Sequence, residues 1–339
     1  MRGCVPSALY RVVRQGRRTL SLAHGARRVH SCPSTARVID IHAHVVLRDS
    51  LGAAGSFGPE VGASECGTPW FRIGDYYLHG VRYEGSPFMD VGVRLERMER
   101  DGIDFQVLSP NPLTYFHHIP RDEATAFCRR HNDALAAIVA QHPTQLGGFA
   151  ALPMQCPASA AAELHRSVRD LGLLGAGIGT DWGVPLDSVE LDPVWEAATE
   201  LDVPIFMHPA PRGIDGPNGD MRLRRFELDV VVGFSLESTV AISTLIFGGV
   251  LSRHPRLDIC FPSGGGAVSA LAGRLAAATT APRAWVSEDL QPRGAFNEAL
   301  RRLWFDTHLH DDVALQALRG HVGDSHLVFG TVSCRIALP

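Results

Sequence analysis

From residue 38 onward, short apolar segments of strand type alternate with helical patterns, and this alternation limits the possible folds more than any other feature. Strands that alternate with helices indicate parallel β/α units. Eight such strands with seven intervening helices predict an α/β protein with a (β/α)8 TIM barrel, in which chemistry lies at the carboxyl ends of the strands. A doubly wound sheet is the alternative, but no G-x-G-x-x-G motif follows an early strand. We expect strands near residues 37–42, 104–109, 145–151, 174–179, 203–207, 257–262, 303–306 and 326–330, and helices around 91–101, 122–141, 157–170, 190–200, 227–250, 266–278 and 311–321.

Residues 47–90 form a long insertion between the first expected strand and its helix. Loops of this length in a compact domain are usually functional or disordered, and disordered linkers carry few aromatic residues. We therefore expect the insertion to fold over the mouth of the barrel, within one domain that covers residues 37–339. Its aromatic residues include Trp70, Phe71, Tyr76, Tyr77, Tyr83 and Phe88.

The first 36 residues contain many arginines, and the first acidic residue of the chain is Asp40. Such a composition is typical of a mitochondrial presequence, although an upstream start codon or a disordered tail is the alternative that we favour. In either case we expect residues 1–36 to lie outside the fold. The seven cysteines are scattered without a C-x-x-C pair, which favours a reducing compartment and a cytoplasmic protein.

Charge and hydropathy narrow the classes of partner. A net charge of -4 indicates no basic surface for nucleic acid. We find no apolar run of the roughly 18 residues that a membrane span requires. Small molecules are therefore the expected partners, and the apolar helix at 227–250 is suited to form part of a homodimer interface.

His42 and His44, in the stretch VIDIHAHVV, lie one residue apart at the end of the first expected strand. Side chains alternate along a strand, so both imidazoles point the same way, toward the active-site face of a barrel. His208, in VPIFMHPAP, ends the fifth expected strand and offers a third imidazole. Three neutral imidazoles with an open position are typical of a catalytic zinc site. The alternative is that the His42–His44 pair has only a structural role.

Further motifs follow one another along the chain: WF at 70–71, VRYEGSPFMD, GIDFQVLSP, HNDALAAIVAQHP, LSRHPRLDICF and SGGGAVSALAGR. In their order, and over about residues 37–331, the chain resembles the amidohydrolase-related decarboxylases (the amidohydrolase 2 family), most closely the branch of aminocarboxymuconate-semialdehyde decarboxylases. The resemblance implies a TIM barrel of the metal-dependent hydrolase type. It also implies a metal-dependent enzyme, usually with zinc, that removes a carboxylate from an unsaturated or aromatic acid, while some relatives hydrolyse or hydrate their substrates.

The resemblance assigns roles to individual residues. It makes His42, His44 and His208 the ligands of Zn2+ or another divalent metal. It makes Arg82 the arginine that binds the substrate carboxylate, because the family's arginine stands in this loop a few residues before an Asp, here Asp90. A planar guanidinium holds a carboxylate through two hydrogen bonds. The alternative is that Arg82 is one of many solvated arginines.

Two residues depart from the family pattern. Ser263 precedes the G-G-G after the sixth strand, where the family has a His that handles the proton. Val332 follows the eighth strand, where the family has an Asp. A serine cannot replace an imidazole as a proton shuttle near neutral pH, although it can orient a water molecule. We expect the last barrel helix to be missing; we favour a truncated or frameshifted end over a branch with different chemistry or a degenerate barrel.

Three more residues are candidates near the pocket. His308, after the seventh strand, is placed to supply the missing imidazole for catalysis, alongside Ser263. Phe116, after the second strand, is expected to face an unsaturated substrate, and Trp182, after the fourth, is placed for substrate contact. His310 and Asp311 match a family element that begins a helix.

We therefore expect a metal-dependent carboxy-lyase (decarboxylase) that acts on a small unsaturated or aromatic carboxylic acid. A metal-dependent hydrolase or hydratase of a ring-cleavage product is one alternative, and a catalytically impaired binding barrel is another. The substitutions of the family's His and Asp by Ser263 and Val332 affect the expected catalytic turnover. The three expected metal ligands are all present.

Overall fold

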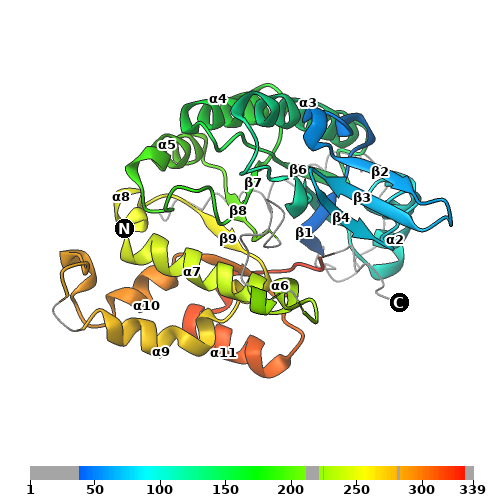
Figure 1. The fold of residues 1–339 in the computed structure, drawn as a ribbon. Coiled ribbons are helices and arrows are strands. Elements are labelled where there is room, and N and C mark those ends of the chain that lie inside the picture. Colours follow the sequence, from blue (N-terminus) through cyan, green and yellow to red (C-terminus); the bar gives the residue numbers. More distant parts are fainter. Residues whose placement is uncertain (1–37, 211–220, 224, 281–282, 333–339) are drawn as a thin grey trace, which may run out of the picture.

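The computed structural model describes residues 38–210, 221–223, 225–280 and 283–332. Eight parallel strands form a rolled sheet in the order β1-β5-β6-β7-β8-β9-β10-β11 (Figure 1). The Ile41 N–H donates to the Phe329 carbonyl at 3.1 Å, so the end of the last strand returns to the first. The predicted TIM barrel is confirmed. Its strands are β1 (Ile39–Val45), β5 (Phe105–Pro110), β6 (Leu146–Ala150), β7 (Gly175–Ile178), β8 (Ile205–Met207), β9 (Ile259–Phe261), β10 (Trp304–Asp306) and β11 (Leu327–Val328).

Two expectations concern the ends of the chain. The separate segment 1–36 and the absence of a closing helix after residue 332 both fall outside the described residues. Within them, most barrel strands are short apolar runs, and every residue of β1 (IDIHAHV) is buried, its Asp and two His included. Parallel strands that are covered on both faces read in this way, because neither face meets solvent.

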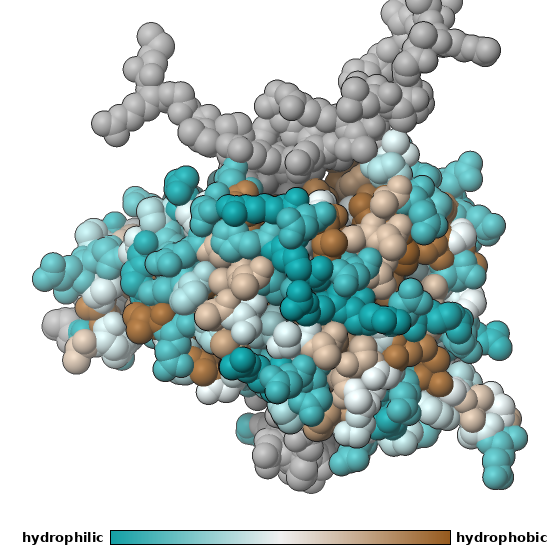
Figure 2. Space-filling view, turned by 90° about the horizontal axis from the view of Figure 1, so that it is seen from above, coloured by the Kyte–Doolittle hydropathy of each residue, from teal (hydrophilic) through white to brown (hydrophobic). Residues whose placement is uncertain are grey.

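Helices surround the barrel (Figure 1). Asp90 begins α2 by accepting the Val93 N–H, and Asp311 begins α11 by accepting the Val313 N–H, so the helix start expected at Asp311 is confirmed. On the face made by α3 and α4, seen in Figure 2, hydrophilic residues dominate and hydrophobic ones are scattered. The helices are α2 (Val91–Asp101), α3 (Arg121–Gln141), α4 (Pro157–Arg169), α5 (Asp192–Leu201), α6 (Leu228–Val231), α7 (Gly233–Phe247), α8 (Val250–Arg253), α9 (Val268–Ala278), α10 (Ala295–Leu300) and α11 (Asp312–Val322).

The single helix expected at 227–250 is wrong, since the structure divides it into α6, α7 and α8. Gly249, with a φ of 72°, takes the left-handed conformation that separates α7 from α8. By length and composition alone, the helical run Leu228–Phe247 is apolar enough to cross a membrane, and 39% of its apolar window is buried inside the protein. The expectation that no such run exists is therefore wrong by this measure. A helix that packs against a protein core passes the same test, and Leu245 of α7 is fully buried in the main core.

The insertion is folded, as expected. It contains a three-stranded antiparallel sheet of β2 (Glu60–Ala63), β3 (Pro69–Ile73) and β4 (Tyr76–His79), which lies beside β1 (Figure 1). Phe71 and Ile73 of β3 are completely buried in a second hydrophobic cluster, where they join Phe116 and Phe127 from the second β/α unit. This packing fixes the insertion to the carboxyl end of the barrel and lets β4 reach the pocket.

Candidate metal centre and its pocket

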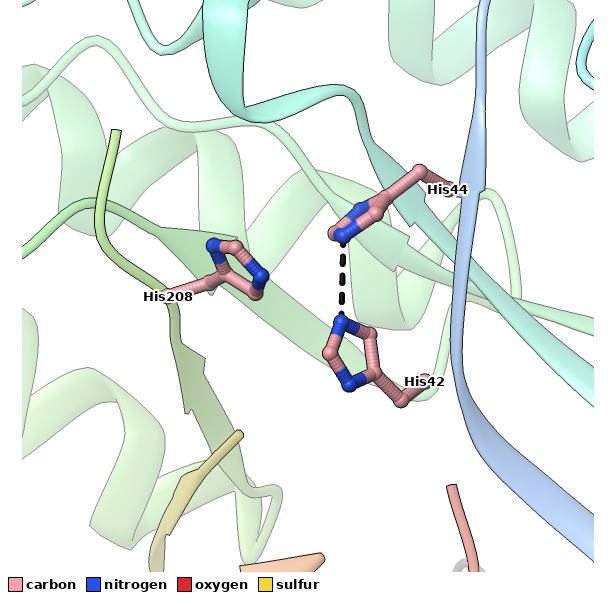
Figure 3. A group of neighbouring side chains, drawn as sticks. All are labelled: His42, His44 and His208. Carbon is pink, nitrogen blue, oxygen red and sulfur yellow. Dashed lines mark hydrogen bonds between the residues drawn. The ribbon is translucent and has the colours of Figure 1, made fainter. Parts of the chain in front are cut away.

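Three imidazoles converge at the carboxyl end of the barrel (Figure 3). His42 and His44 lie on the same side of β1, and His208 directly follows β8. The three rings are buried, and their candidate ligand nitrogens all lie within 4.8 Å of one another. The structure therefore brings together the three histidines that the sequence singles out.

Each of the three rings is oriented by an oxygen that approaches its Nδ1. Carboxylate and carbonyl oxygens accept hydrogen bonds, so each Nδ1 carries the proton and each Nε2 keeps its lone pair. The ring of His42 donates to Asp306 Oδ2 at 2.5 Å, that of His44 to the Pro110 carbonyl at 3.1 Å, and that of His208 to the Pro209 carbonyl at 2.6 Å.

The donor set fits a divalent cation. The Nε2 atoms of His42 and His44 are 3.1 Å apart, and two lone pairs at this distance repel unless a cation lies between them. Burial, followed by the neighbouring imidazoles, lowers the pKa of His44 well below its usual value. Burial, followed by His42, does the same to the pKa of His208. These rings therefore stay neutral at ordinary pH, which a metal ligand requires.

Asp306 is a supporting residue whose role the sequence did not reveal. It is the last residue of β10, is completely buried, and also accepts the His308 N–H at 3.1 Å through Oδ1. A Cβ on Gly330 would lie 2.9 Å from the Cβ atoms of both Asp306 and His42, so this position requires glycine. A carboxylate at the end of a barrel strand is the signal that could have indicated this role.

A buried polar network also holds β1 in place. Asp40, whose pKa is raised by burial, lies at its centre and links β1 to β5 and to the segment after β11. Arg94 of α2, 2% exposed, extends the network to the backbone of the metal centre. Its hydrogen bonds run to Asp40 from the His42 N–H, the Thr331 N–H and hydroxyl and the Gln106 amide, and from Arg94 to Gln106 Oε1 and to the His44 carbonyl.

A cavity of about 380 Å3 opens above the imidazoles. Most of its wall is apolar or aromatic, which suits a planar unsaturated ligand. Its described lining residues are His44, Tyr76, Leu78, Val81, Tyr83, Phe88, Asn111, Pro112, Leu113, His208, Glu227, Asp229, Val230, Phe234 and Val332.

Val332 and Arg82, which the resemblance singles out, lie in different positions relative to this cavity. Val332 lines it with a φ of 48°, an uncommon conformation for a β-branched residue. Arg82 is exposed, whereas its neighbours Val81 and Tyr83 are buried and line the cavity. Arg82 is not among the described residues that line the cavity, and its expected contact with the substrate carboxylate stays a prediction.

Phe116 and Trp182 were expected to face the substrate, and the structure instead places both in packed surroundings. Phe116 is 1% exposed and packs edge-on against Phe127, with ring centres 4.7 Å apart. The Trp182 indole donates to the Gly179 carbonyl at 3.0 Å and lies in the main core. Neither is among the described residues that line the cavity. Phe116 has a φ of 56°, a local reversal of the chain that the sequence does not indicate.

The two expected catalytic residues differ in position: His308 lies near the metal centre, and Ser263 lies in the turn after β9. Ser263, with a φ of 49°, begins a short turn after β9 and is not among the described residues that line the cavity. The ring centre of His308 lies 6.4 Å from that of His42 and 4.6 Å from that of His310. His308 thus approaches the metal centre from β10, as expected, beside one of the three imidazoles.

Comparisons with known proteins identify the family of the chain and agree with its fold. A sequence model of the amidohydrolase family matches residues 39–331. The 2-amino-3-carboxymuconate-6-semialdehyde decarboxylase of Dictyostelium discoideum is 31% identical over 86% of this chain and 80% of its own length. The gamma-resorcylate decarboxylase of Rhodococcus jostii is 33% identical over 70% of each chain. The dihydroxybenzoic acid decarboxylase of Polaromonas, solved with manganese and 2-nitroresorcinol, has a similar fold, with a TM-score of 0.66, 24% identity and coverage of 88% and 86%.

Proposed function

The chain belongs to the amidohydrolase family, and we propose that it is a divalent-metal-dependent decarboxylase of an unsaturated or aromatic carboxylic acid. The observation that carries this proposal is the convergence of three imidazoles, each oriented through its Nδ1, at the base of a largely apolar cavity. Relatives that share 31% and 33% identity with the chain are decarboxylases of such acids. The resemblance noted from the sequence motifs is confirmed by these relatives.

Decarboxylation breaks the bond between a carbon and its carboxylate, and a proton takes the place of the departing carbon dioxide. His42, His44 and His208 would hold the cation, which supplies positive charge beside the substrate oxygens. The aromatic and aliphatic walls exclude water and pack against a planar acid. Because Ser263 cannot titrate near neutral pH, we assign the proton transfer to His308, whose ring lies beside His42. In this scheme Ser263 orients a water molecule.

Zinc is the cation that we propose. A set of three imidazole nitrogens with no described thiolate or carboxylate among them is the donor set of several catalytic zinc sites. Manganese, which the Polaromonas relative contains, is the competing candidate. Metal analysis of protein purified without added metal tests the choice: about one zinc per chain supports the proposal, and stoichiometric manganese or iron contradicts it.

The reaction is tested by metal removal and reloading. Protein that has been stripped with a chelator is expected to release no carbon dioxide from 2,6-dihydroxybenzoate or related hydroxy- and aminobenzoates. Reloading with one divalent ion per chain is expected to restore release. Incorporation of labelled water into an unsaturated acid without carbon dioxide release would instead identify a hydratase or hydrolase. Failure to bind any metal would identify a binding barrel.

We also propose that two copies of the chain associate through the outer face of α7 and α9. This face contains a groove and exposes large apolar side chains, which single-chain proteins seldom cluster. Val230 and Phe234 of the same helical segment line the cavity, so a second copy would lie next to its mouth. A mass near twice 36.7 kDa by light scattering supports the dimer, and a monomer at micromolar concentration contradicts it. The residues of the groove include Leu236, Val240, Leu271, Leu275 and Trp285.

A further inference from the structure

The charged residues among the described lining of the cavity come from only two places. Apart from the imidazoles of the metal centre, its charged members are Glu227 and Asp229. Both come from the segment that begins α6, where Glu227 precedes the helix and Asp229 lies in its first turn. The cavity is therefore lined by imidazoles of the candidate metal centre and, from another segment, by two acidic residues. We call Glu227 and Asp229 the acidic wall.

Both acidic residues line the cavity; Glu227 is exposed, whereas Asp229 is half-buried. Burial, followed by the negative charge of Asp229, raises the pKa of Tyr76, which puts Asp229 near β4. Tyr76 is itself a lining residue, and the Asp229 side chain is half-buried. A few residues later, Phe234 packs edge-on against His208 with ring centres 5.5 Å apart. The segment 227–234 thus carries both acidic residues and an aromatic ring that packs against a histidine of the metal centre.

These charges act on the end of the substrate that does not react. A cation held by His42, His44 and His208 would neutralise the departing carboxylate of a bound acid. A second carboxylate would meet the fixed negative charges of Glu227 and Asp229, whereas an ammonium or hydroxyl group would find acceptors there. Interactions between exposed or half-exposed charges are weak, and two of them together change affinity by about tenfold.

We infer that Glu227 and Asp229 determine specificity, and that the cavity selects monocarboxylic acids with an amino or hydroxyl donor over dicarboxylic acids. This inference rests on the proposed function and narrows it. Among the relatives' substrates, 2,6-dihydroxybenzoate carries one carboxylate and two hydroxyl donors. The carboxymuconate semialdehyde carries two carboxylates. The acidic wall favours the first kind of acid.

The test compares three ligands that differ only in one substituent: benzoate, 3-(aminomethyl)benzoate and isophthalate. Their dissociation constants are measured by calorimetry on the metal-loaded full chain. The wild type is expected to bind the aminomethyl compound most tightly and isophthalate most weakly. In a protein with both Glu227→Gln and Asp229→Asn, the aminomethyl compound is expected to bind about tenfold more weakly and isophthalate about tenfold more tightly. Benzoate should change less than twofold.

A matched control is Glu99→Gln, which removes one negative charge from the exposed surface of α2, away from the cavity. It is expected to leave all three constants unchanged, and 0.5 M salt is expected to reduce the contrast in the wild type. Equal changes for the three ligands in the double variant, or three constants that all stay within twofold of the wild type, overturn the inference. The contrast does not require turnover, so a protein that shows it without releasing carbon dioxide contradicts the proposed reaction and retains the inference.

Discussion

Replacement of His208 with alanine is expected to remove stoichiometric metal binding and, with it, carbon dioxide release. The three Nε2 atoms share one centre, so two imidazoles would remain where a catalytic zinc site has at least three protein ligands. The loss should exceed the 10- to 100-fold that removal of an outer hydrogen-bond partner typically costs. Metal content by mass spectrometry and zinc affinity by competition with a chelator measure the effect directly.

Asp306→Asn provides a graded comparison. It keeps all three ligands but removes the carboxylate that receives the His42 Nδ1 proton, so zinc affinity should fall by about 10- to 100-fold. His79→Gln, at an exposed histidine of β4, should bind metal as the wild type does. One tightly bound metal ion per chain in His208→Ala would show that the three imidazoles are not the site.

The barrel and the three imidazoles could be predicted because both depend on local patterns. Buried parallel strands are short apolar runs, and the two-residue repeat of a strand fixes His42 and His44 on one side. The position of His208 follows once β8 is recognised as a strand. These inferences do not require knowing which residues far apart in the sequence are in contact.

The supporting residues depend on contacts between residues far apart in the sequence, so the sequence indicates at most that a carboxylate ends a barrel strand and not which residue it supports. Asp306 is 264 positions from His42, and the glycine requirement at Gly330 arises from the approach of β11 to both residues. Arg82 was placed by resemblance alone, and a motif in an irregular segment does not say which way the side chain points. The exposed position of Arg82 between two buried neighbours follows from how the insertion packs.

The division of the helix at 227–250 has a related cause. Apolar residues lie on all sides of most of this segment, so periodicity does not reveal where one helix ends and the next begins. The break before α7 brings Glu227 and Asp229 to the cavity, and the sequence pattern alone gave no reason to place these two acids there. The acidic wall is therefore a property of the folded chain.

Acid is expected to destabilise the protein through His131, a buried histidine of α3 for which neither ring nitrogen has a hydrogen-bond partner in the structure. Burial lowers the pKa of His131 from 6.5 to about 3. Below pH 6.5 the unfolded chain therefore binds a proton that the folded chain rejects, and stability falls until the pH reaches the folded value. At pH 5 this difference costs about 2 kcal/mol of unfolding free energy.

His131→Leu removes the titrating ring and keeps an apolar side chain beside Phe127, whose ring centre lies 5.5 Å from that of His131. Urea unfolding at pH 8 and pH 5 should show that the variant gains about 2 kcal/mol relative to the wild type over this interval. The comparison cancels other groups that titrate in both proteins, and any change in packing shifts both pH values equally. His79→Gln should follow the wild type, because its side chain is exposed. Parallel pH profiles for His131→Leu and the wild type would show that His131 is protonated in the folded chain as readily as in the unfolded one.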